Sequence, residues 1–330
     1  MQRVLGSCIL SLIIYIMVGR LVPDRPLSLG YFDLEIQDKA ARMAVLPTPK
    51  LVILAGSNGP YSHSCAVIGS MLTLPCENAG IAVGIGLDDL FAIYGPEIHA
   101  GDIIYMPLET AQYIVSRSQD DAGPDGSILL ERNSAILGRF PLDRIVGAFF
   151  SNSFLDLLES TVEIPVADSG LMSASKLIGE EYNEAGDRIG TSLATADQSI
   201  LADASRNEPS GVEIAQGYGS MLVRNFVAVE TQHGVTVIGG LPTDFQTVPL
   251  PPDTIATIRS IYVANGGRFA VLRNLSRYPK SDFYDSEDHL AQPCQYMHSI
   301  AIAGLLSQAL RMPLRPPSSD IRRIAATCPA

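Results

Sequence analysis

The segment LVILAGSNGPYS, residues 51–62, decides how the rest of the chain is interpreted. Its first five residues are apolar and run directly into Gly56-Ser57-Asn58-Gly59, after which a helix is expected. A buried strand that turns sharply into a helix presents the turn residue at the carboxyl edge of a parallel sheet. The first N–H groups of that helix stabilise negative charge. We therefore identify Ser57 as the candidate nucleophile, with a plain helix N-cap as the other interpretation.

A nucleophilic serine needs a base, and the best candidate lies far downstream in the segment FYDSEDHL, residues 283–290. His289 would take the proton of Ser57, and Asp285 would orient the imidazole and stabilise its charged form. Asp288, directly before the histidine, is the alternative acid. The remaining histidines have no acidic neighbours in a catalytic pattern and are interpreted as structural: His63, His99, His233 and His298.

Strand and helix patterns alternate over much of the chain. Strands are predicted at about 50–55, 76–83, 103–106, 234–240 and 268–272, and helices at about 62–72, 87–94, 253–263 and 295–310. Such alternation favours right-handed crossovers and a parallel sheet covered by helices on both faces. The sequence therefore predicts an α/β fold of three α/β/α layers around a mostly parallel five-stranded sheet, within a domain that covers residues 50–310.

Residues 115–232 interrupt this alternation and are predicted to be an insertion. The part from 178 to 215 is polar and rich in Gly, Asp and Ser, which fits a lid or a partner-binding segment over the carboxyl edge of the sheet. A plain surface excursion is the alternative. Residues 23–49 are expected to be a tether with a short amphipathic helix, and residues 311–330 a C-terminal tail.

An apolar run from Val4 to Gly19 lies between Arg3 and Arg20. It is close to the length of about 20 residues that a membrane helix needs, and no small-x-small cleavage site follows it. We expect residues 1–22 to be an uncleaved signal anchor, with the body of a single-pass inner-membrane protein in the periplasm. A cleaved signal peptide and a buried soluble helix are the other interpretations.

The composition describes an ordered globular protein, with 330 residues, 47% hydrophobic and 18% charged. A net charge of −12 argues against nucleic acid as a partner. Tryptophan is absent, so the 12 tyrosines would have to supply any sugar-stacking surface.

The sequence predicts no metal or cofactor. The five cysteines show no metal-binding spacing, and Cys65 and Cys76 could either pair in an oxidising compartment or remain buried thiols. Gly84-Ile85-Gly86 lacks the third glycine of a dinucleotide motif, and Gly59 is not followed by the Lys-Ser/Thr of a phosphate-binding loop.

The blocks at about 50–115 and 234–310 resemble the SGNH/GDSL hydrolase superfamily. The likeness is greatest to its membrane-anchored, exopolysaccharide-associated branch, which includes alginate O-acetylation proteins and DltD-like proteins. Gly56-Ser57-Asn58 is similar to the nucleophile block, and Asn78-Ala79-Gly80 is similar to the block whose glycine N–H binds the oxyanion. The segment from Tyr284 to Leu290 looks like the block with the acid and the histidine. The resemblance implies a flavodoxin-like fold and a Ser-His-Asp triad.

Two departures from the family pattern stand out. The family spaces its acid and base as Asp-x-x-His, whereas Asp285 lies one residue further from His289 and Ser286 takes the expected place. In the third block, Glu109 stands where the family offers an asparagine to the oxyanion. An ionised Glu109 cannot donate a hydrogen bond and would repel an oxyanion. The side chain of Asn58 could supply the missing donor.

The resemblance implies a serine esterase or acyltransferase that acts on an O-acylated exopolysaccharide, with a link to cellulose synthesis. Its partners would be the acylated polymer, a polysaccharide synthase complex and the membrane. The alternative is a non-catalytic accessory protein that binds glucan or a synthase through the same cleft, which Glu109 favours. A cytoplasmic esterase would require that the N-terminal segment does not insert.

Overall fold

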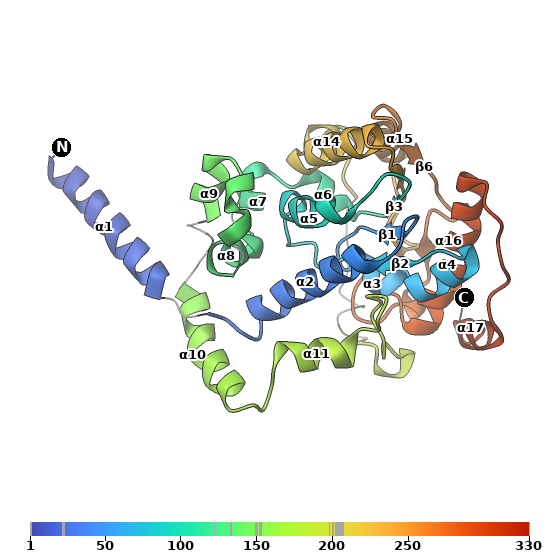
Figure 1. Ribbon diagram of the computed structural model, residues 1–330, viewed down its shortest axis with the longest axis horizontal. Helices are drawn as coiled ribbons and strands as arrows, with labels where there is room; N and C mark the ends of the chain where they lie inside the picture. The colour runs from blue at the N-terminus through green and yellow to red at the C-terminus, as the bar shows by residue number, and fades with distance from the viewer. Residues whose placement is uncertain are drawn as a thin grey trace. The chain divides into compact units, whose positions relative to one another are not determined.

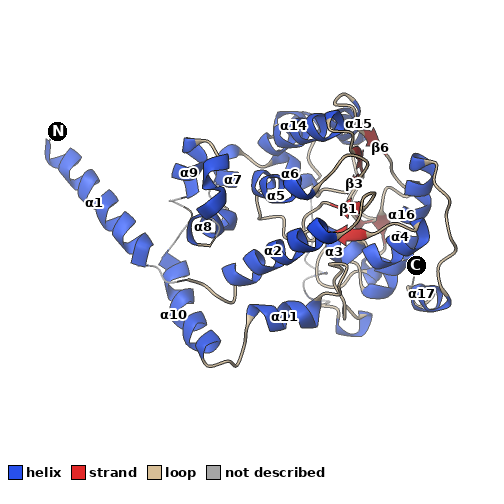
Figure 2. Cartoon of the chain, in the orientation of Figure 1, coloured by secondary structure: helices blue, strands red, loops and turns tan. Residues whose placement is uncertain are grey.

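The five predicted strands form one all-parallel sheet in the computed structural model, in the order β2-β1-β3-β4-β6. Figure 2 draws the strands in red among the helices. Their bounds are β1 Leu51–Ile53, β2 Cys76–Asn78, β3 Ile103–Met106, β4 Thr236–Gly239 and β6 Arg268–Phe269. Strands β1, β2 and β3 are buried along their whole length, as expected for strands covered on both faces. The α/β class and the five-stranded parallel sheet are therefore confirmed.

The structure describes residues 2–21, 24–121, 123–132, 134–148, 151, 154–197, 199, 201 and 208–329. The chain divides into two compact units. The first holds Met1–Glu35 and Ser118–Glu180, and the second holds Ile36–Arg117 and Glu181–Ala330. The chain thus begins in the first unit, enters the second, returns to the first and ends in the second (Figure 1).

In its described residues, the first unit consists of helices: α1 Gln2–Leu21, the start of α2 Leu29–Val45, α7 Arg117–Asp121, α8 Pro124–Glu131, α9 Leu142–Ala148, α10 Phe154–Asp168 and α11 Ala174–Glu181. The buried Arg25 holds α10 through Asp156 and through Glu159, which lies 3.3 Å away. Glu163 accepts hydrogen bonds from the main chain at Leu27 and Ser28, at the entrance to α2. Ion pairs and caps therefore join α10 to the N-terminal segment.

Most of the predicted signal anchor, residues 1–22, forms helix α1. Its first and last residues lie outside the described residues. Within the described part of the chain, no helix is both long and apolar enough to cross a membrane.

Helices cover both faces of the sheet in the second unit (Figure 1). They are α3 Asn58–Ser62, α4 Cys65–Leu72, α5 Leu87–Tyr94, α6 Thr110–Ile114, α13 Gly211–Gln216, α14 Tyr218–Gln232, α15 Pro252–Val263, α16 Gln292–Leu310 and α17 Ser319–Ala325. Helices α4 and α16 pack on Leu51, Ile53 and Tyr105 in one core cluster. Helices α14 and α15 contact β4. A further pair of parallel strands, β5 Asp244–Phe245 and β7 Arg277–Tyr278, was not predicted.

The amino edge of the sheet is closed by a buried ion pair. The Nζ atom of Lys50 lies 2.7 Å from Asp102, and both side chains are fully buried. The same carboxylate accepts hydrogen bonds from the main-chain N–H groups of Lys50 and His99. Because every oxygen of the buried carboxylate is paired, this cluster holds the starts of β1 and β3 together without leaving an isolated charge.

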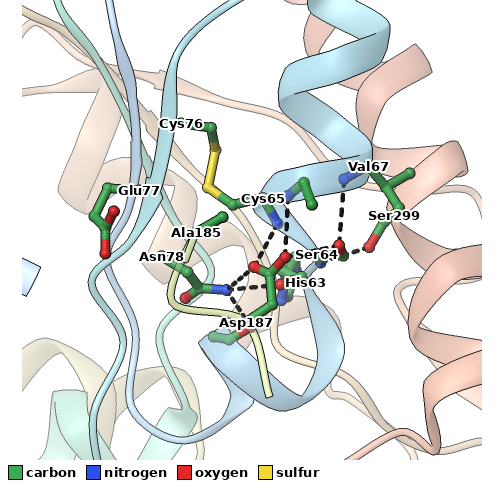
Figure 3. The surroundings of a disulfide bond; sticks show 12 residues. His63, Ser64, Cys65, Val67, Cys76, Glu77, Asn78, Ala185, Asp187 and Ser299 are labelled. Carbon is green, nitrogen blue, oxygen red and sulfur yellow. Dashed lines mark hydrogen bonds between the residues drawn. A yellow bond between two sulfur atoms is a disulfide. The ribbon is translucent and has the colours of Figure 1, made fainter. Parts of the chain in front are cut away.

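The region predicted as an insertion is divided between the two units. Residues 118–180 belong to the first unit, whereas α13 and α14 are part of the helical cover of the sheet. Between them, Asp187 lies beside the first turn of α4 and accepts hydrogen bonds from the main chain at Cys65 and Ala66 (Figure 3). Asp187 thus satisfies free N–H groups at a helix N-terminus.

Two disulfides lie in the second unit. Cys65 at the start of α4 is bonded to Cys76 in β2, which decides between the two interpretations of this pair (Figure 3). Cys294 in α16 is bonded to Cys328, so the C-terminal segment is fixed to the helix that follows the predicted histidine block. Cys8 is a free cysteine.

Gly219 in α14 provides a test of the packing between α14 and α6. A Cβ atom at this position would overlap the main-chain oxygen of Gln112, whereas at Gly304 in α16 the nearest atom would be 4.0 Å away. We expect Gly219→Ala to lower the free energy of unfolding by at least about 2 kcal/mol through overpacking. We expect Gly304→Ala to raise it by up to about 1 kcal/mol, because alanine is the better helix former. Urea denaturation of the three proteins measures both, and equal stabilities would contradict this packing.

Candidate active site

Ser57 lies in the turn between β1 and α3, as predicted, with its side chain partly exposed. It occupies the N-cap position of α3, yet its hydroxyl makes no capping hydrogen bond. Among the described residues, none bonds to this hydroxyl or to the main-chain N–H of Ser57. A partly exposed hydroxyl without a structural partner is what a nucleophile requires, so the N-cap interpretation has no support in the contacts.

The carboxyl group of Glu109 holds this turn from below. Glu109 follows β3 and is fully buried, and it accepts hydrogen bonds from the amides of Gly56 at 2.9 Å and Asn58 at 2.8 Å. It also forms a reciprocal capping box with Gln112 at the start of α6. Burial raises the pKa of Glu109, and the amide hydrogen bonds from Asn58 and Gly56 oppose that rise. Glu109 therefore fixes the two residues that flank Ser57.

His289 and Asp285 form the predicted pair. The Nδ1 atom of His289 lies 2.5 Å from Oδ1 of Asp285. The extra residue between them is accommodated because the loop folds back on itself: the N–H of Tyr284 donates to the carbonyl of His289 at 2.8 Å, and Phe283 bridges Leu290. The departure from Asp-x-x-His therefore does not separate the acid from the base.

Asp288, the alternative acid, has a different environment from Asp285. Its carbonyl oxygen accepts a hydrogen bond from the hydroxyl of Ser62 at 2.7 Å and lies 2.9 Å from the hydroxyl of Thr243. The side chain of Asp288 is buried, whereas that of Asp285 is about one-third exposed. The carboxylate that contacts the imidazole is thus that of Asp285, and the main chain of Asp288 holds the loop in place.

Direct contacts bring the serine turn and the histidine loop to one rim. The N–H of Leu290 donates to the Ser62 hydroxyl at 3.2 Å, and the ring of Tyr61 stacks on the ring of His289 with centroids 3.7 Å apart. Ser62 and Tyr61 belong to α3, the helix that begins after Ser57. No hydrogen bond joins the Ser57 hydroxyl to His289 within the described residues, and catalytic hydrogen bonds often tighten only when substrate is bound.

Gly80 follows β2 and lies against the serine turn. A Cβ atom on it would be 2.7 Å from the carbonyl oxygen of Gly56 and 3.0 Å from the Cα atom of Gly59, so only glycine fits. Its carbonyl accepts a hydrogen bond from Lys39, while its N–H bonds to no residue in the described part of the chain. Among the described residues, none therefore bonds to the amide of Gly80, which the sequence predicts as an oxyanion donor, or to the amide of Ser57.

The side chain of Asn58, which was also predicted as an oxyanion donor, takes part in structural hydrogen bonds. It is fully buried, and its Nδ2 donates to the carbonyl of Pro107 at 2.9 Å. Its Oδ1 accepts from the main chain and the hydroxyl of Thr243. These bonds tie the serine turn to the segments after β3 and β4, so Asn58 has a structural role in the contacts described here.

His63 and His298 form a buried chain of hydrogen bonds behind the serine turn. The Nδ1 of His63 donates to the carbonyl of Asn58 at 3.2 Å, and the two Nε2 atoms lie 3.1 Å apart. His298 Nδ1 lies 2.8 Å from the Tyr278 hydroxyl. Burial lowers the pKa of both histidines, so both rings are neutral. Because a carbonyl can only accept, the proton of His63 is on Nδ1, so His63 accepts from His298 and His298 accepts from Tyr278. Both histidines are structural, as the sequence predicted.

Sequence reasoning missed Tyr61, Thr243 and the supporting role of Glu109. From the sequence, Glu109 only replaces the asparagine that donates to the oxyanion in the family. A hydrogen bond to the main chain of a distant turn leaves no sequence pattern. Tyr61 stands four residues after Ser57, so it lies one helical turn further along the chain. That spacing could have indicated a side chain beside the nucleophile.

The described residues hold one group with the arrangement of a metal site, Asp282 with Cys294 and Cys328. Its two sulfurs are joined in a disulfide and cannot act as thiolate ligands. A surface groove of about 600 Å³ lies between α6, α13 and α14, lined by residues that include Arg117, Tyr218 and Arg224. None of the predicted site residues lines it.

In comparisons with protein-family models, with curated proteins and with solved structures, nothing matches this chain.

The buried histidines predict a loss of stability in acid. Burial lowers the pKa of His63 from 6.5 to about 4. Above pH 6.5 the imidazole of His63 is neutral in both the folded and the unfolded chain. Between pH 6.5 and 4 it gains a proton only in the unfolded chain. We expect the folded protein to lose about 3 kcal/mol of stability over this range from His63, and a His63→Gln variant to lack that part of the pH dependence.

Urea denaturation at pH 7 and pH 4 measures this difference. The exposed His99 offers the matched control, because His99→Gln should leave the pH dependence of the wild type in place. The same pH dependence in the wild type and in His63→Gln would show that His63 is not held neutral by burial.

Proposed function

We propose that this protein is a serine acyl-transfer enzyme, an esterase or acyltransferase of the SGNH type. The observation that carries the proposal is the Asp285–His289 pair, which the contacts of Ser62 and Tyr61 hold on the same rim as Ser57. A serine hydroxyl that bonds to none of the described residues and a carboxylate-bound imidazole in a contacting loop are the components of nucleophilic catalysis.

The proposed reaction proceeds in two balanced steps. The Ser57 oxygen attacks the ester carbonyl carbon while its proton passes to Nε2 of His289, and the charge of the tetrahedral intermediate is held by the amides of Ser57 and Gly80. The intermediate collapses when the carbon–oxygen bond of the ester breaks and His289 returns the proton to the leaving alcohol. Water or a sugar hydroxyl then releases the acyl group from Ser57 by the reverse sequence.

The proposed substrate is an O-acylated exopolysaccharide, with a link to cellulose synthesis and to a synthase complex. This substrate class comes from the resemblance to the exopolysaccharide-associated branch of the superfamily. The partly exposed ring of Tyr284 beside the catalytic loop agrees with it, because tyrosine faces stack on sugar rings.

A non-catalytic protein that binds glucan or a synthase remains the second candidate. It is favoured by Glu109, which places a carboxyl group where the family has a hydrogen-bond donor, and which lies close enough to His289 to interact with it electrostatically. Against it, Glu109 is bonded to the main chain of the serine turn and leaves the amides of Ser57 and Gly80 free.

We propose that the site lies outside the cytoplasm, on the periplasmic side of the inner membrane. Disulfides form and persist in such compartments, and this chain pairs four of its cysteines. Helix α1 would hold the protein at the membrane, since Val4, Leu5 and Leu10 are each more than half exposed and lipid would cover them.

The disulfides predict the number of reactive thiols. In protein isolated from the periplasmic side and denatured without reductant, we expect a maleimide to modify one of the five cysteines, Cys8, and to modify all five after reduction. A Cys8→Ser variant is the control and should not react before reduction. Three or more reactive cysteines in the unreduced wild type, counted by mass spectrometry, would contradict an oxidising location.

Labelling by a fluorophosphonate probe tests the catalytic proposal. We expect the wild-type protein to be labelled at Ser57, and Ser57→Ala to be unlabelled. We expect Ser57 in His289→Ala to be labelled roughly a thousandfold more slowly than in the wild type, because the serine then lacks its base. The matched control is Ser318→Ala, which removes the exposed N-cap serine of α17 and should not change labelling. A wild-type protein without labelling at Ser57 would support the non-catalytic candidate.

The two acids can be separated in the same assay. Asp285→Asn removes the carboxylate that contacts the imidazole and should slow labelling strongly. Asp288→Asn keeps the main-chain carbonyl that Ser62 and Thr243 bind, so its effect should be much smaller. The reverse order would assign the acid to Asp288.

A further inference from the structure

A column of alternating cations and aromatic rings ends at the imidazole of His289. The guanidinium carbon of Arg188 lies 5.3 Å from the ring centroid of Tyr182 and 5.4 Å from that of Tyr61. Lys39 lies 5.0 Å from the Tyr182 ring. Tyr61 in turn stacks on His289, with ring centroids 3.7 Å apart and an angle of 10° between the planes. The column thus reaches the proposed base through one aromatic face.

The column is supported by a hairpin that the sequence did not predict. Tyr182 bridges Arg188 in an antiparallel pair, and the N–H of Ile189 donates to the carbonyl of Glu181 at 2.9 Å. The N–H of Arg188 donates to the carbonyl of Pro60 in α3 at 3.0 Å. On the other side of the hairpin, the carbonyl of Ala185 accepts a hydrogen bond from the N–H of Asn78 in β2.

Burial keeps the phenol of Tyr61 neutral, and the hairpin holds its ring in place. Burial raises the pKa of Tyr61 to about 12, so its phenol keeps its proton under ordinary conditions. Arg188 is paired with the carboxylate of Glu181, which orients the guanidinium beside the ring. Arg188 of the hairpin therefore contacts the ring of Tyr61, and Tyr61 also presents a ring face to His289.

Several charged or titratable groups lie near His289. Asp285 bonds to its Nδ1, and the buried Glu109 interacts with it electrostatically. Tyr284 and Asp288 belong to its own loop, and Arg188 is reached only through the Tyr61 ring. The carboxylate of Asp285 stabilises the imidazolium that forms when Nε2 takes a proton in the proposed reaction, and the face of a tyrosine ring does so as well.

Building on the proposed function, we propose that Tyr61 is a positioning residue of the acyl-transfer site. Its ring face holds the imidazole of His289 against tilting, while Asp285 fixes the ring within its own plane. When the Ser57 proton reaches Nε2, the same ring face stabilises the imidazolium by a cation–π interaction. Tyr61 acts on the base and makes no contact with the reacting ester in this proposal.

Two substitutions at position 61 separate the ring from the hydroxyl. We expect Tyr61→Leu to slow fluorophosphonate labelling of Ser57 roughly three- to thirtyfold, the range of a cation–π interaction. Tyr61→Phe keeps the ring and should stay within about twofold of the wild type. Tyr296→Leu is the control, because it removes another half-buried tyrosine from the core cluster of α16. Thermal denaturation of each variant identifies any loss of folded protein.

The second measurement does not depend on activity. Selective isotope labelling of the five histidines gives few ring resonances, and a His289→Gln variant assigns the one of interest. We expect the His289 ring protons to be shifted upfield by the Tyr61 ring in the wild type and in Tyr61→Phe, and to lose that shift in Tyr61→Leu.

Each outcome bears on the proposal. Slower labelling and a lost upfield shift in Tyr61→Leu, with both kept in Tyr61→Phe, would support it. Unchanged labelling in Tyr61→Leu would overturn it. A wild type that is never labelled at Ser57 would overturn the proposed function and the role of Tyr61 with it, and the ring-proton shifts would then report only whether the stack exists.

Discussion

The hydroxyl of Ser62 is the contact on which the proposed site depends. It donates to the carbonyl of Asp288 and accepts from the N–H of Leu290, so one buried side chain binds the main chain on both sides of His289. The hydroxyl of Thr243 lies beside the same carbonyl, and the main-chain N–H of Thr243 donates to the side chain of Asn58. Three segments that are far apart in the sequence are thereby fixed at one edge of the sheet. These buried polar groups are satisfied by one another, which makes the arrangement specific.

Glu109 shows how a change of residue type can alter a local structure without dismantling it. A buried carboxylate is costly unless hydrogen bonds compensate for the lost hydration. Here the compensation comes from main-chain amides on either side of Ser57 and from the cap of α6. The main-chain N–H of Ser57 bonds to none of the described residues. An acceptor beneath the turn therefore holds it through two main-chain amides, and it lies close enough to His289 to interact with it electrostatically.

The sequence predicted the α/β class, the positions of the five strands and the proximity of Asp285 to His289, because these depend on local apolar runs and on short loops. It did not reveal that residues 115–232 are divided between two units. The segment lacks the alternation of strands and helices from which the sheet was predicted. It left Cys65 and Cys76 undecided and gave no sign of Cys294 with Cys328. Contacts such as those of Ser62, Glu109 and Arg188 join distant segments, and a single sequence carries no signal for such pairs.

The order in which the chain visits the two units has a consequence for biosynthesis. Strand β3 needs β4 as its neighbour, and Ile103 pairs with Thr236, so the centre of the sheet stays unpaired on one side until most of the polypeptide has been made. Parallel pairing over such sequence distances is slow and leaves strand edges exposed in the meantime. The helical segment that intervenes would be complete by then. The nascent sheet would thus depend on protection, from a chaperone or from its own early helices, until its last third emerges.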